Sequence, residues 1–222
     1  RRGNKYVGSR AYNNAARKPD NAAVLFKRLM GTSTPVKLPA VNLTMTPEEC
    51  SAEVLRALYG YLPEEIRGDG DTGTVITVPA AFNQMQKDST MAAADAAGLG
   101  RVALMQEPVA AVMSVMRQRK TDGIFVVYDI GGGTLDVAIA ESIGGRVNLL
   151  AHGGIAMCGG RDFDRILFDN VVKPWLLENF DLPEDLASNS QYKSLRTLAT
   201  WAAEKAKIAL SQSDESVISL AE

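Results

Sequence analysis

The segment DIGGGTLD, Asp129 to Asp136, decides the fold. Apolar and aromatic residues at 124–128 predict a buried strand that ends at Asp129. The three glycines that follow can adopt positive φ angles, so their backbone N–H groups can form a cradle for phosphate oxygens, and Thr134 adds a hydroxyl group. The carboxylates of Asp129 and Asp136 bracket the turn and can hold a hydrated cation against the phosphate. The alternative is a plain glycine hairpin with two solvated acids.

Strands and helices alternate around this segment. An alternation of this kind predicts a mostly parallel sheet with helices packed on it, because a parallel return requires a crossover. Two antiparallel strands joined by Gly144 and Gly145 are expected next. The expected strands are residues 74–78 and 124–128 (both buried on both faces), 102–105, 133–141, 146–152 and 216–220, and the expected helices are residues 21–30, 46–61, 83–97, 108–119, 162–180 and 195–211.

Composition narrows the class of protein. The chain has 222 residues, 24 Lys plus Arg and 26 Asp plus Glu, so it offers no basic face for a nucleic acid. Cys50 and Cys158 are isolated, and His152 is the single histidine, so a zinc site is not expected. A P-loop signature is absent, and no apolar run is long enough to span a membrane. We therefore expect a cytoplasmic protein, and the missing initiator methionine suggests a fragment.

Several motifs resemble one family. The chain is similar to the nucleotide-binding domain of the seventy-kilodalton heat-shock chaperones of DnaK type. This resemblance implies an α/β, actin-like ATPase (ribonuclease H-like) fold, truncated at both ends. The motifs are DIGGGTLD, VITVPAAFN (Val75 to Asn83), QEPVAAV (Gln106 to Val112), VGSRA (Val7 to Ala11), FKRLMGT (Phe26 to Thr32), TPEECSAEVL (Thr46 to Leu55), CGGRDFD (Cys158 to Asp164) and EKAKIALS (Glu204 to Ser211).

The resemblance implies roles for individual residues. Glu107 positions the attacking water, although it could equally be a helix N-terminal acid stabilised by the dipole. Asp129 orients water bound to Mg²⁺, and Asp136 lies near a cation. Pro79 and Lys87 pass the nucleotide state to another domain, and Lys87 stands where the family usually has arginine. The implied nucleotide-binding residues are Gly131, Gly132, Gly133, Thr134, Gly159 and Gly160 for the phosphates and Glu204, Lys207 and Ser211 for adenine and ribose. The last three also fit a solvated stripe on one helical face.

Two positions depart from the family pattern. In an ungapped alignment, the lysine that contacts the transferred phosphate falls on Tyr12, which cannot supply that charge. Arg10 is a candidate replacement, because in an extended strand it would point to the same face as Tyr12. Arg161 stands where the family has an acid.

The resemblance also implies a function. We expect residues 1–119 and 120–222 to be parts of two lobes of a domain that binds ATP or ADP with Mg²⁺, and K⁺ as a further candidate ion. The parent protein would be a Mg²⁺-dependent ATPase, and the isolated fragment inactive. Its partners would be client peptides bound through a separate domain, a J-domain co-chaperone and a nucleotide exchange factor, with neither nucleic acid nor membrane. The alternatives are a non-hydrolysing nucleotide sensor of the same family and an actin-like cell-shape filament protein, although TPEE and EKAKIALS argue against the filament.

Overall fold

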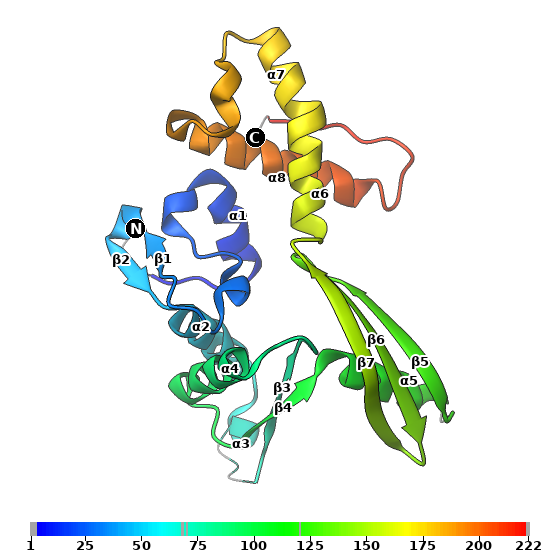
Figure 1. Ribbon diagram of the computed structural model, residues 1–222. Helices are drawn as coiled ribbons and strands as arrows, with labels where there is room; N and C mark the ends of the chain where they lie inside the picture. Colours follow the sequence, from blue (N-terminus) through cyan, green and yellow to red (C-terminus); the bar gives the residue numbers. More distant parts are fainter. Residues whose placement is uncertain (1–3, 68, 70, 120, 221–222) are drawn as a thin grey trace.

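The computed structural model describes residues 4–67, 69, 71–119 and 121–220. Helices and three small sheets alternate along the chain, so the expected α/β class is confirmed (Figure 1). The helices are α1 (Ser9–Arg17), α2 (Pro47–Gly60), α3 (Glu64–Arg67), α4 (Gln84–Ala97), α5 (Glu107–Arg119), α6 (Gly160–Leu167), α7 (Lys173–Asn179) and α8 (Lys193–Ala209). The 3₁₀ turns are η1 (Pro19–Asn21), η2 (Phe26–Leu29), η3 (Pro39–Val41), η5 (Glu184–Ala187) and η6 (Ser190–Tyr192), and a π-helical segment η4 (Phe168–Val172) joins α6 to α7.

The strands form three sheets. Strands β1 (Val36–Leu38) and β2 (Leu43–Met45) are antiparallel, and β3 (Thr74–Val78) and β4 (Val102–Gln106) are parallel. Strands β5 (Gly123–Ile130), β6 (Thr134–Ile143) and β7 (Arg146–Ala156) form an antiparallel sheet in that order. The prediction of a mostly parallel sheet is therefore wrong, because β5 pairs with β6 and leaves the parallel ladder with two strands.

Local sequence signals explain several helices. Helix α2 begins with a capping box, in which Thr46 and Glu49 exchange side-chain and backbone hydrogen bonds and Pro47 takes the first helical position. Helix α4 has the same device at Asn83 and Gln86. Both helices begin and end within about one residue of the predicted bounds.

Two hydrophobic clusters hold the helices. The first lies where η4 and α7 pack against η5 and α8, and the second joins α2 and α4 to β4. The first contains Phe168, Val172, Leu176, Leu186, Ala199 and Ala203, and the second contains Ala52, Ala94, Ala97 and Leu99. Among the described residues, no helix is both long and apolar enough to cross a membrane.

Some expected elements differ. Residues 21–30 do not form a helix, because Leu25 has φ of 60° and only the short turn η2 follows it. Residues 216–220 do not form a strand. The strands at residues 74–78 and 124–128 are not buried on both faces, since Val75 is 56% exposed and Val126 is 68% exposed.

Candidate functional site

The glycine turn joins β5 to β6 as a tight hairpin. Gly131 N–H donates to Thr134 O at 2.9 Å, and Asp129 faces Asp136 across the ladder. The predicted positive φ angles are wrong: none of the glycines 131–133, all within the described chain, lies in the left-handed region. The absence of a side chain at Gly133 leaves room for Arg28, since a Cβ there would lie 2.3 Å from Nε of Arg28 and would displace its guanidinium.

Three predicted carboxylates border one small cavity. Glu107 begins α5, and Asp129 and Asp136 come from β5 and β6 beside the turn. The cavity has a volume of about 10 Å³, roughly the room for one water molecule. Its remaining lining residues are Ala80, Pro108, Val127, Val137, Ala138, His152 and Gly153.

The donor set suits a hard divalent cation. Carboxylate oxygens are the usual protein ligands of Mg²⁺, which keeps several waters and is often shared with substrate phosphates. In the described part of the chain, no cluster of three His, Cys, Asp or Glu side chains could hold a metal. Asp129 and Asp136 place two carboxylates at the cavity beside the turn.

A lysine that sequence reasoning missed faces Glu107. Nζ of Lys27, on η2, donates to Oε1 of Glu107 at 2.9 Å. Lys27 belongs to the FKRLMGT motif, so the sequence marked this segment as part of the family pattern. The helix expected at residues 21–30 did not predict that its side chain contacts Glu107. The pair places a cation beside Glu107, one of the three carboxylates that border the cavity.

The predicted glycines at 159 and 160 lie against the glycine turn. Gly160 N–H donates to Gly131 O at 3.0 Å. A Cβ at Gly159 would lie 2.5 Å from the backbone N of Gly133, so this contact also requires glycine. The structure thus brings together the two glycine segments that the sequence assigned to phosphate binding.

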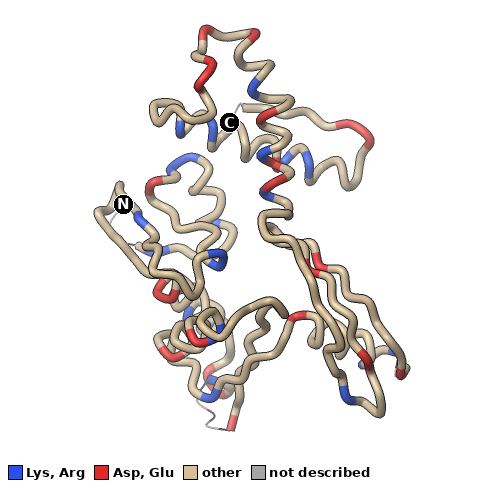
Figure 2. The backbone as a smooth tube through the Cα atoms, in the orientation of Figure 1, with Lys and Arg blue, Asp and Glu red and all other residues tan. Residues whose placement is uncertain are grey.

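Helix α8 carries Glu204 and Lys207, two of the three residues predicted to contact adenine and ribose. Nζ of Lys207 donates to Gly160 O at 2.8 Å and lies 2.6 Å from Oδ1 of Asp164. Ser211 is exposed and lies in the turn beyond α8, so the expectation that it continues the same helical face is wrong. Figure 2 shows acidic and basic residues close together along the facing helix α6.

Tyr12 contacts α8. Its hydroxyl group donates to Glu204 and lies 2.8 Å from both carboxylate oxygens, and the Arg161 guanidinium lies 5.6 Å from the centre of its ring. Burial, followed by the hydrogen bond to Glu204, raises the pKa of Tyr12 to about 12.

Arg10 does not share a face with Tyr12. Both residues lie in helix α1, where residues two apart point in different directions, so the extended arrangement is wrong. The Arg10 guanidinium instead lies 3.9 Å over the ring of Tyr6.

Pro79 and Lys87 are the residues predicted to pass on the nucleotide state. Pro79 is buried directly after β3, and its carbonyl accepts a hydrogen bond from Phe82 N–H at 3.1 Å. Lys87 is half-buried in the first turns of α4. Pro79 follows β3 and Lys87 lies on the next helix, α4, and their signalling role stays a prediction.

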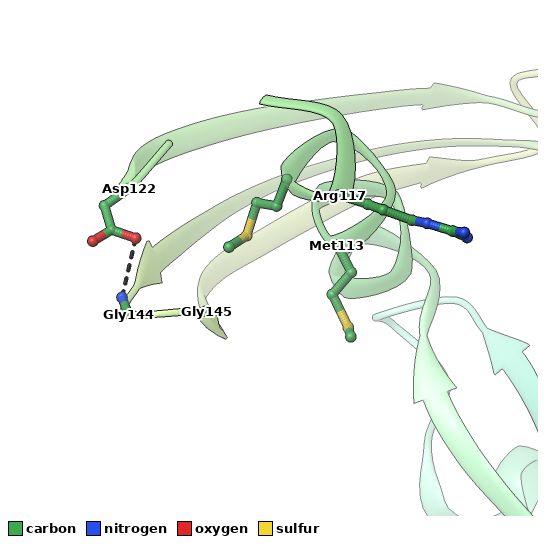
Figure 3. A pocket seen from close by; sticks show the side chains of 6 residues that line it. Met113, Arg117, Asp122, Gly144 and Gly145 are labelled. Carbon is green, nitrogen blue, oxygen red and sulfur yellow. Dashed lines mark hydrogen bonds between the residues drawn. The ribbon is translucent and has the colours of Figure 1, made fainter. Parts of the chain in front are cut away.

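A larger pocket lies away from these residues. It has a volume of about 440 Å³ and lies between the end of α5 and the β6–β7 hairpin (Figure 3). Asp122 accepts a hydrogen bond from Gly144 N–H at 3.0 Å at its rim. Its lining residues are Met113, Met116, Arg117, Asp122, Gly144 and Gly145, none of which belongs to the predicted site.

Comparisons with known proteins identify the family. The model of the family described as "Hsp70 protein" matches residues 1–222. The chain is 35% identical to a "Chaperone protein HscA homolog" of Aliivibrio salmonicida, over 97% of this chain and 36% of that protein. It is 38% identical to a "Chaperone protein dnaK" of Phaeodactylum tricornutum, over 83% of this chain and 29% of that protein. The chain spans about a third of the length of these relatives. With the glycine turn and the carboxylates in place, these matches show that the chain belongs to the Hsp70 family and represents part of its actin-like ATPase domain.

Proposed function

We propose that this chain binds ATP and ADP with Mg²⁺ and hydrolyses ATP as part of a complete chaperone. The observation that carries the proposal is the meeting of Glu107, Asp129 and Asp136 at one cavity beside the glycine turn. Residues 1–119 and 120–222 are proposed as parts of two lobes, which supply the cation of Lys27 and the phosphate turn respectively.

The residues divide the work as follows. Asp129 and Asp136 hold the hydrated cation, which offsets phosphate charge, while residues 131–134 and the glycines at 159 and 160 face the phosphates. Glu107 accepts a hydrogen bond from Lys27 and is held where it can orient water. Phosphoryl transfer depends mainly on positioned charge, so a lysine paired with this carboxylate supports hydrolysis. Glu204, Lys207 and Ser211 are proposed to contact the nucleoside.

Lys27 is therefore proposed to supply the positive charge that the family's lysine, aligned with Tyr12, would provide. Tyr12 is held by Glu204, whereas Lys27 pairs with a carboxylate of the cavity. This arrangement favours an active ATPase over a non-hydrolysing sensor, and the family match favours a chaperone over a filament protein.

The wider functional assignments rest on the family. We propose that the complete protein couples its nucleotide state to peptide binding in a separate domain and works in the cytoplasm with a J-domain co-chaperone and a nucleotide exchange factor. The two relatives named above are chaperones by their printed names, and this supports the assignment.

Single-turnover ATP hydrolysis by the complete protein tests the proposal. Lys27→Met should slow hydrolysis by roughly 10²–10³-fold, the usual cost of removing one group that stabilises a transition state. Lys37→Met, at an exposed position of β1, is the matched control and should leave the rate unchanged. Tyr12→Lys should bring no gain.

Two outcomes would contradict it. Faster hydrolysis by Tyr12→Lys, with Lys27→Met unimpaired, would return the missing charge to Tyr12 and favour the sensor. A wild-type protein that binds neither ADP nor ATP in the presence of Mg²⁺ would refute nucleotide binding itself.

A further inference from the structure

The glycine turn has all three of its carbonyl groups engaged on one side. Gly160 N–H donates to the first carbonyl of residues 131–133 and Arg161 N–H donates to the second, each at 3.0 Å. The third, Gly133 O, accepts a hydrogen bond from Nη2 of Arg28 at 2.9 Å. The first two donors belong to the first turn of α6, whereas Arg28 comes from η2, more than 100 residues earlier.

The directions of these three carbonyl groups fix the directions of the N–H groups that follow them. In a trans peptide the C=O and the following N–H point in opposite directions. Carbonyls turned toward α6 and Arg28 therefore turn the N–H groups of residues 132–134 to the other side. N–H groups presented together in this way form an anion-binding surface.

Arg28 is fixed by more than this one bond. Its Nη2 also lies 3.3 Å from Oδ2 of Asp162, and that same oxygen accepts a hydrogen bond from Gly159 N–H at 3.0 Å. Its Nη1 lies 3.3 Å from Sδ of Met157. Asp162 is only 8% exposed, so the guanidinium meets a largely buried carboxylate.

The guanidinium occupies space that glycine leaves open. A Cβ at Gly133 would lie within 3 Å of three guanidinium atoms of Arg28. Nε of Arg28 is buried, and the described residues offer it no hydrogen-bond partner. A buried donor without a partner is costly, so the contacts of the other two nitrogens must hold the side chain there.

We propose that Arg28 is a positioning residue for the phosphate turn: it holds Gly133 O so that the N–H side of residues 132–134 faces the polyphosphate of the nucleotide. This inference rests on the proposed function, because the anion is the phosphate of ADP or ATP. The planar guanidinium serves here because it holds two nitrogens in a fixed geometry, Nη2 against Gly133 O and the carboxylate of Asp162 and Nη1 against Sδ of Met157, whereas an ammonium group has only one nitrogen.

The first experiment tests, without nucleotide, whether Arg28 holds the glycine turn; this contact between Arg28 and Gly133 O is called the clamp below. Hydrogen–deuterium exchange is followed in the complete protein for peptides covering residues 129–136 and 157–162, comparing wild type with Arg28→Met and Arg28→Lys. Arg28→Met should speed exchange of the turn at least tenfold, and Arg28→Lys less. Arg56→Met is the matched control, because Arg56 also bonds a backbone carbonyl, Ala96 O, and a carboxylate, Glu53, away from the turn. Unchanged exchange in both Arg28 variants would overturn the clamp, even for a protein that failed to bind ADP.

The second experiment separates positioning from general stability. Calorimetric titration with MgADP and with adenosine is carried out on the same proteins. Arg28→Met should weaken ADP binding about tenfold and leave adenosine binding unchanged, since adenosine has no phosphate, and Arg28→Lys should recover part of the loss. An equal loss for both ligands would mean a structural role only and would overturn the proposal, as would an unchanged ADP affinity. A wild-type protein that does not bind ADP would instead refute the proposed function.

Discussion

The hydroxyl group of Tyr12 lies 2.8 Å from each carboxylate oxygen of Glu204 and links α1 to α8. A protonated tyrosine can donate this hydrogen bond, whereas a tyrosinate would meet the carboxylate as a second negative charge. Burial and the hydrogen bond both favour the neutral form, and they raise the pKa of Tyr12 from 10.0 to about 12. The Arg161 guanidinium near the ring acts in the opposite direction and only partly offsets this.

This pKa predicts how stability depends on pH. Folding strengthens proton binding at Tyr12, so the contribution is fully present below pH 10 and is lost as the pH rises from 10 to 12. Tyr12→Phe should unfold at lower denaturant concentration than wild type at pH 8, and the gap should close between pH 10 and 12. Urea unfolding of the 222-residue chain across this range measures the gap.

The control for this prediction is Tyr61→Phe. Tyr61 is 78% exposed, so its removal should produce no gap that closes in this way. A gap for Tyr12→Phe that stays constant, or widens at high pH, would show that the hydroxyl does not act through its proton.

At the scale of elements, a buried charge lies between α6 and α8. Asp164 of α6 is 1% exposed, and its Oδ1 lies 2.6 Å from Nζ of Lys207 on α8. Lys207 also donates to the carbonyl of Gly160, at the first residue of α6. The lysine predicted for nucleotide contact is therefore also the counter-charge that allows the two helices to pack.

Removing this lysine should weaken the helix pair. Lys207→Met should lower the free energy of unfolding by about 3–5 kcal/mol, because it leaves a buried carboxylate without its partner. Lys205→Met on the same helix should cost no more than about 1 kcal/mol, since Lys205 is exposed and its ammonium group lies over the ring of Trp201. Denaturant unfolding of the two variants provides the comparison, and equal losses would show that the pair does not support the packing. Asp164→Asn added to Lys207→Met should restore part of the stability.

The elements that the sequence predicted well are those with local signals. Helices α2 and α4 begin where they were predicted, and the structure shows a capping box at each start, at Thr46 and at Asn83; the glycine pair at 144–145 predicted the β6–β7 hairpin. The glycine turn and its two flanking aspartates also lie where the motif predicted them. These features depend on interactions within a few residues, which a single sequence contains.

The elements that were missed depend on distant contacts. Helix α1 is mostly polar, and it is held through Tyr12 and α8 rather than by an apolar stripe of its own. The spacing of Leu25, Phe26 and Leu29 fits a helix, yet the segment forms only a short 3₁₀ turn, from which Lys27 contacts Glu107 and Arg28 contacts the glycine turn. Ion pairs between residues about 80 or more positions apart cannot be read from spacing alone.

At the scale of the whole molecule, the described residues cover the three-stranded sheet on one face and leave its other face exposed. Helix α5 lies on the face that carries Val127, Asp129 and Asp136, with Glu107 and Pro108 bordering the shared cavity (Figure 1). The alternate residues of β5 point to the other face, where their side chains are 51–69% exposed. These residues are Ile124, Val126, Tyr128 and Ile130, and their ladder partners include Ile139.

Such a surface should cause the 222-residue chain to self-associate. Monomeric soluble proteins rarely expose contiguous apolar patches larger than a few hundred Å², and β5 is also an edge strand with unpaired backbone groups. Sedimentation velocity should show the chain shifting to larger species as its concentration rises. Val126→Lys should reduce the shift, because a charged group in the middle of the patch must lose water on association. Val41→Lys, at a position 57% exposed on η3 and outside the three-stranded sheet, should leave it unchanged. A chain that remains monomeric at every concentration would show that the exposed face does not drive association, and equal effects of the two lysines would attribute the change to net charge rather than to the sheet.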